Sequence, residues 1–148
     1  MQDLKVDRGD WIVVCDGRKA LILENAGSRK SPSLRTVERR EHADRPTREQ
    51  GSAAPGRVQQ SVGSARSSME QTDWQDEAER DFLHALAARL DAAVKTGETR
   101  ALVIVAAPRA LGMLRQAYTP HIRAVLRKEL DKDFVRVPVS EIEARLFS

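Results

Sequence analysis

Residues 26–66, here called the arginine-rich segment, hold the side chains best suited to contact a polyanion. The segment carries nine basic and four acidic side chains, a balance of +5, and eight of the nine cations are arginine. An arginine guanidinium can hold a phosphate through two parallel hydrogen bonds. A solvated surface loop without a polyanion partner would have the same composition, so both interpretations stay open. The side chains expected to contact phosphate are Arg45, Arg48, Arg57, Ser61 and Arg66.

Carboxylates could instead support hydrolysis by bound divalent metal, which needs acidic ligands on neighbouring strands. Asp16 directly follows an apolar run and has the right position for one ligand. The later apolar run, however, ends in Ala106-Ala107-Pro108, without an acid where a second ligand would belong. We therefore expect no metal site.

Other catalytic patterns are also weak. The three histidines lack metal-ligand spacing, and Cys15 lies in an apolar run, where a cysteine usually behaves as a small hydrophobe. The sequence has neither a phosphate-binding nor a dinucleotide-binding glycine pattern. We expect a protein that is not an enzyme and has no cofactor.

A second candidate site is a crevice where an apolar run turns into a helix. The carboxyl ends of parallel strands, beside helix N-termini, commonly bind anions. The alternative is an ordinary strand-to-helix turn in which Gly112 allows close packing. The crevice residues would be Asp16, Pro108, Arg109 and Gly112.

The composition is that of one globular domain spanning residues 1–148. The chain has a net charge of +3, is 41% hydrophobic and 32% charged, and contains one cysteine, which excludes an internal disulfide. Its longest apolar run, residues 101–108, is less than half a membrane span, and no signal-like segment opens the sequence. We expect a cytoplasmic protein that does not insert into membranes.

Apolar patterns predict the elements that position these side chains. The first 40 residues predict a hairpin and a third, edge-type strand, followed by a long basic loop over about 41–72. A stripe repeating every fourth residue then predicts a long amphipathic helix, with Thr72 and Gln75 as a capping box and with Trp74 and Phe82 in the core. The expected strands are 11–15, 20–24, 34–38, 101–107 and 125–130, and the expected helices are 74–94, 109–118 and 141–147.

Two details of the C-terminal part depend on context. Residues 122–130 fit a helical face as well as a strand, but the topology favours a strand over 125–130. Ser140 and Glu143 form a capping box for the last helix. The order is a three-strand antiparallel meander followed by α-β-α-β-α, which predicts an α/β fold with a single mixed five-stranded sheet. Ribonuclease H-like folds have this order.

Several stretches taken together resemble the bacterial host attachment family of proteins required for attachment to host cells. The most specific stretch is Ala107-Pro-Arg-Ala-Leu-Gly-Met-Leu-Arg115. The others are Trp11-Ile-Val-Val-Cys-Asp-Gly-Arg-Lys-Ala20, Pro55-Gly-Arg-Val-Gln-Gln-Ser-Val-Gly63 with Arg66, Phe82-Leu-His-Ala-Leu-Ala-Ala-Arg-Leu90 and Lys128-Glu-Leu-Asp-Lys-Asp133.

The resemblance implies kinship with the middle domain of eukaryotic class-1 release factors. In those factors a Gly-Gly-Gln tip on the loop after the meander promotes peptidyl-tRNA hydrolysis. Here the corresponding loop has Gln50-Gly51 and Pro55-Gly-Arg57 but no Gly-Gly-Gln, so the hydrolytic role does not carry over. We expect a domain that binds RNA or the ribosome and affects attachment indirectly. The alternative is a protein–protein interaction module in attachment or biofilm pathways.

Overall fold

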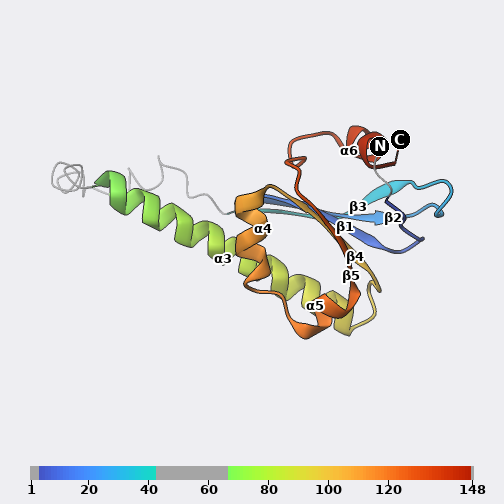
Figure 1. Ribbon diagram of the computed structural model, residues 1–148, viewed down its shortest axis with the longest axis horizontal. Helices are drawn as coiled ribbons and strands as arrows, with labels where there is room; N and C mark the ends of the chain where they lie inside the picture. Colours follow the sequence, from blue (N-terminus) through green and yellow to red (C-terminus); the bar gives the residue numbers. More distant parts are fainter. Residues whose placement is uncertain (1–3, 43–66, 148) are drawn as a thin grey trace.

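The computed structural model describes residues 4–42 and 67–147, which form one mixed sheet with helices on both faces (Figure 1). The strands are β1 (Trp11–Cys15), β2 (Lys19–Asn25), β3 (Leu34–Glu41), β4 (Leu102–Ala106) and β5 (Leu126–Leu130). The helices are α3 (Ser67–Lys95), α4 (Pro108–Arg115), α5 (Pro120–Val125) and α6 (Val139–Phe147).

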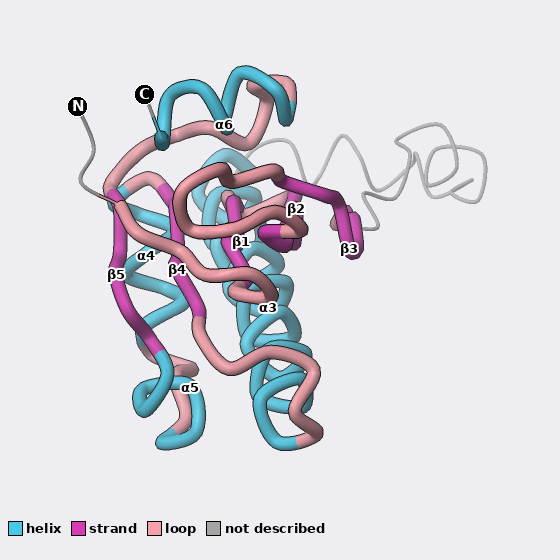
Figure 2. The backbone as a smooth tube through the Cα atoms, turned by 90° about the vertical axis from the view of Figure 1, so that its right-hand side faces the viewer, coloured by secondary structure: helices cyan, strands magenta, loops and turns pink. Residues whose placement is uncertain are grey.

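The strand order is β3-β2-β1-β4-β5, with β3 and β5 at the two edges (Figure 2). The central strand β1 pairs antiparallel with β2 and parallel with β4, so Val14 lies between Leu21 and Val105. Every residue of β1 and β4 is buried, as expected for strands covered on both faces. The predicted α/β class and single five-stranded sheet are confirmed.

Alternate residues of the strands supply two separate cores. On one face, Val13 and Ile104 belong to a cluster with side chains of α3, α4 and α5. On the other face, Val14 and Val105 pack with side chains of α6 and of the segment that precedes it. In Figure 1, α6 therefore lies above the sheet, while α3 and α5 lie below it.

Helix α3 is longer than the sequence pattern predicted, and its first part extends beyond the sheet (Figure 1). It begins at Ser67, so the expected loop over 41–72 is too long at its end, and Thr72 and Gln75 are not its cap. Twenty-nine helical residues span roughly 43 Å, whereas a five-residue strand spans roughly 17 Å. From Trp74 onward, the first buried residue is Leu83.

The core position expected for Trp74 is consequently wrong, because this residue precedes the part of α3 that packs against the sheet. Trp74 is 61% exposed. Phe82, two turns later, packs half-buried against the core as expected. Periodicity indicates which face of a helix is apolar, but not where the rest of the domain ends.

The C-terminal part contains one helix more than predicted. Thr119 caps α5 by accepting a hydrogen bond from the Ile122 backbone N–H at 3.1 Å, and Leu126 then starts β5. The elements after the meander are therefore α-β-α-α-β-α. Both interpretations of residues 122–130 hold in part, since the helix covers the first residues and the strand covers the rest.

The capping box assigned to the last helix is also wrong. Ser140 lies inside α6, which starts at Val139. Glu143 instead uses Oε1 to accept a hydrogen bond from the Leu34 backbone N–H at 2.8 Å. A contact across the fold, invisible in local sequence, thus ties α6 to the edge strand β3.

Among residues 4–42 and 67–147, none of the helices combines the length and the apolar character that a membrane span requires.

Candidate nucleic-acid interface

The five side chains expected to contact phosphate (Arg45, Arg48, Arg57, Ser61 and Arg66) lie outside the described residues. The structure does describe the residues on both sides of this stretch. His42 directly follows β3, and its backbone N–H donates to the Arg18 carbonyl at 2.6 Å. The chain is described again from Ser67, the first residue of α3.

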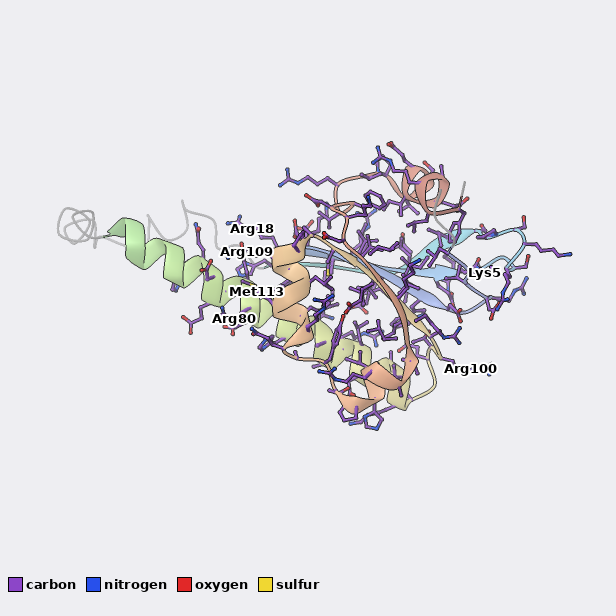
Figure 3. The ribbon with its side chains drawn as sticks, in the orientation of Figure 1. Lys5, Arg18, Arg80, Arg100, Arg109 and Met113 are labelled. Carbon is purple, nitrogen blue, oxygen red and sulfur yellow. The ribbon has the colours of Figure 1, made fainter. Side chains whose placement is uncertain are left out.

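Three surface hollows lie at the end of the sheet beside His42, and Arg18 lines all three. Figure 3 shows Arg18 and Arg109 together at this end, beside α3. We call the three surfaces the Trp74 hollow, the crevice and the basic hollow. The Trp74 hollow is lined by Arg18, His42, Trp74, Gln75, Ala78 and Glu79. The crevice is lined by Asp16, Gly17, Arg18, Glu79, Ala107, Arg109 and Ala110. The basic hollow is lined by Asp16, Arg18, Lys19, Glu41, His42 and Arg136.

Arg18 is positioned by the tight turn between β1 and β2. Asp16 Oδ1 accepts hydrogen bonds from the backbone N–H groups of Arg18 and Lys19, both at 2.8 Å. An aspartate that bonds the backbone two and three residues further on stabilises a turn. The predicted site residue Asp16 therefore lies in the crevice, but its carboxylate builds the turn.

Gly17 lets α3 approach this turn closely. A Cβ added at Gly17 would lie 2.7 Å from Glu79 Cγ and 2.9 Å from Glu79 Cβ. Real Cβ atoms essentially never come so close to another atom. Glycine is thus required for the contact that brings the Glu79 side of α3 to Arg18.

Arg109 joins the start of α4 to α3 by ion pairs. Its guanidinium pairs with the carboxylates of Asp76 and Glu79, the latter at 3.1 Å. The hydrogen bond to Asp76 is the main reason that the pKa of Arg109 is raised. Two acids of α3 therefore share one cation of α4, so this cluster keeps one negative charge.

The other two residues predicted for the crevice are Pro108 and Gly112, and their surroundings differ. Pro108 occupies the first turn of α4, where its missing N–H costs little, and Ala107 gives no side-chain cap. Gly112 is exposed and lines none of the three hollows, and a Cβ added there would meet nothing within 4 Å. The close packing that the alternative interpretation expected at Gly112 is therefore wrong, but its ordinary turn from β4 into α4 is not contradicted.

Trp74 is the candidate functional residue that sequence reasoning misplaced. Its indole is exposed in a hollow whose other wall includes Arg18 and His42. The His42 ring lies 6.2 Å from the Phe82 ring, between centroids. The sequence does contain a signal that Trp74 is at the end of the apolar stripe. The position four residues before it is Glu70, so the stripe does not continue beyond Trp74.

The basic hollow brings together side chains that lie far apart in the sequence. Lys19 comes from β2, His42 follows β3 and Arg136 precedes α6. The acid Glu41 lies opposite Lys19 in the pairing of β2 with β3. Cations from separate elements therefore line one hollow together with His42, the last described residue before position 43.

Cys15 is a free cysteine and is buried. Burial raises the pKa of the Cys15 thiol to about 12, so it stays protonated at neutral pH. Within residues 4–42 and 67–147, no group of three or more histidine, cysteine, aspartate or glutamate side chains is placed to hold a metal ion.

Comparison with known proteins identifies a family. No curated protein matches the sequence. A family model described as "protein required for attachment to host cells" matches residues 11–146, from the start of β1 almost to the end of α6. This span includes the three hollows and the arginine-rich segment. The chain therefore belongs to the family of proteins required for attachment to host cells.

Proposed function

We propose that this host attachment family member binds RNA, free or within the ribosome, as a non-catalytic domain that affects attachment indirectly. The observation that carries the proposal is the concentration of nine cations in residues 26–66, of which Arg39 and Arg40 lie near the end of β3 at the sheet end that adds Arg18, Lys19 and Arg136. Arg29, Lys30 and Arg35 lie at the other end of β3. Phosphate contacts supply most of the sequence-independent affinity for nucleic acids.

The local charges at the sheet end support this proposal. The carboxylate of Asp16 accepts backbone hydrogen bonds, and Glu79 is paired with Arg109. Of the two acids that line the basic hollow, Asp16 is thus already hydrogen-bonded and Glu41 lies opposite Lys19 in the pairing of β2 with β3. Kinship with release-factor middle domains remains part of the proposal, and the mixed sheet with a basic segment after its meander is compatible with it.

Salt-dependent co-sedimentation with ribosomes, together with gel shifts on RNA, tests the proposal. The test variant is Arg57→Ala with Arg66→Ala, and the control is Arg100→Ala with Arg127→Ala, which removes the same charge from exposed positions elsewhere. Figure 3 places Arg100 at the end of the molecule opposite to Arg18 and Arg109. We expect the test variant alone to weaken binding several-fold in low salt.

Each phosphate contact on single-stranded RNA contributes about 0.7 to the slope of log affinity against log salt concentration. Losing two contacts should therefore reduce that slope by about 1.4. If the test variant binds like the control, the arginine-rich segment is not the RNA contact.

The alternative function, a protein–protein interaction module, is favoured by one observation. Trp74 is 61% exposed, and tryptophan is a common centre of protein interfaces. Pull-down from lysate separates the two functions. A protein partner that is retained after ribonuclease treatment and at high salt would favour the alternative.

A further inference from the structure

We infer that the Trp74 hollow receives an unpaired RNA base, stacked on the Trp74 indole, with its adjoining phosphate directed toward Arg18. This inference rests on the proposed RNA binding and adds which form of RNA is recognised and by which residue. No residue of the hollow belongs to the phosphate-contact set expected from the sequence.

The side chains around the hollow have the chemistry that an unpaired nucleotide needs. An exposed indole offers a flat face for stacking, which is worth about 1–3 kcal/mol per base and tolerates any base. The Gln75 amide has two donors and an acceptor for a base edge, and Arg18 carries the charge for a phosphate. These groups line one hollow.

Glu79, the acid that lines the Trp74 hollow, is paired with a cation. Glu79 Oε1 lies 3.1 Å from Arg109 Nη2, and the same guanidinium also pairs with Asp76. Since Arg109 belongs to α4 and both acids belong to α3, the pairs connect the two helices. An anion approaching Trp74 and Arg18 thus meets two carboxylates that share one cation, so their repulsion is reduced but not removed.

The shape of the site favours unpaired RNA over a duplex. Bases within an A-form helix are stacked on each other, and their faces are not available to a side chain. The indole is exposed, and the first part of α3 extends beyond the sheet (Figure 1), so an extended strand can reach it. The hollow is also next to the basic hollow, since Arg18 and His42 line both, so a strand could continue onto the cations.

Intrinsic fluorescence can test the stacking directly, because the chain has two tryptophans in opposite environments. Trp11 is 1% exposed and Trp74 is 61% exposed. We expect a 12-nucleotide oligouridylate to quench the emission of the full chain in low salt, and a blunt RNA duplex of equal length to bind without quenching. In Trp74→Phe, which keeps an aromatic face, affinity should be largely retained while the quenching disappears.

Trp74→Ala should weaken oligouridylate binding by about tenfold or more, and because the side chain is exposed, its thermal unfolding should match that of the original chain. If Trp74→Ala binds oligouridylate with unchanged affinity, stacking is wrong but RNA binding stands. If the original chain binds no RNA in low salt, the proposed function fails and this inference fails with it. If Trp74→Ala loses only a ribonuclease-resistant protein partner, the hollow docks a protein instead, which also overturns the inference.

Discussion

The two ends of α3 carry the same apolar repeat but differ in burial. Toward the C-terminus, Leu83, Leu86 and Leu90 are fully buried against the sheet. Toward the N-terminus, where the helix extends beyond the sheet (Figure 1), no residue from Trp74 to Phe82 is buried, and Trp74 is 61% exposed. One amphipathic stripe can therefore pack into the core at one end of a helix and lie exposed to solvent at the other.

The largest expected effect comes from truncating the buried end. Leu86→Ala should lower the free energy of unfolding by about 2–5 kcal/mol, because it leaves a cavity under a side chain with 0% exposure. Trp74→Ala should change it by less than about 0.5 kcal/mol. Urea denaturation followed by circular dichroism measures both. Similar losses for the two variants would contradict the division of α3 into a core end and an exposed end.

Gly17→Ala tests the contact between the β1–β2 turn and Glu79 of α3. The new methyl group would overlap Glu79, so the turn or the helix must shift, at an expected cost of about 1–3 kcal/mol in unfolding free energy. Oligouridylate affinity should fall as well, because Arg18 would move relative to Trp74. The matched control is Gly112→Ala, which adds the same methyl group where nothing lies within 4 Å and where φ is not positive. A Gly17→Ala chain with unchanged stability would show that the contact is not tight.

Lowering the pH tests the ion pairs of Arg89, which lies in the buried end of α3. Arg89 donates to Glu38 at 2.9 Å and to Glu98 at 3.0 Å, and its guanidinium lies 5.5 Å from the centre of the Trp11 ring. The hydrogen bond from Arg89 lowers the pKa of Glu98, and for Glu38, burial raises the pKa but the bonds from Arg89 and Arg40 outweigh it.

A carboxyl whose pKa is lower in the folded state stabilises the fold above its unfolded pKa of about 4.3, and this contribution is lost as pH falls through the folded pKa. Unfolding measured from pH 6 to pH 3 should therefore lose stability less steeply in Arg89→Met than in the original chain. Since these groups are partly exposed, the difference should be about 1 kcal/mol or less. Parallel pH curves for the two chains would contradict a role for Arg89 in these shifts.

Local patterns in the sequence predicted the sheet well and the site only in part. The hairpin, the buried strand β4 and the five-stranded sheet follow from short apolar runs and turn residues, which are local signals. The exposure of Trp74 and the bond from Leu34 to Glu143 depend on where distant elements end, and no local pattern encodes that. Asp16 was correctly placed at the strand end, but its bonds to the backbone of its own turn became evident only in the structure.

Gly112→Ala should have the smallest effect and the opposite sign. Helix α4 buries Leu111, Met113 and Leu114 but leaves Gly112 exposed between them, with nothing within 4 Å of an added Cβ. Alanine in place of glycine inside a helix stabilises it by about 0.5–1 kcal/mol, since less backbone entropy is lost on folding. The urea midpoint should therefore rise while RNA affinity stays unchanged, because Gly112 lines none of the three hollows. A variant that gains stability but loses RNA binding would move the functional face from the Trp74 end of α3 to the outer face of α4.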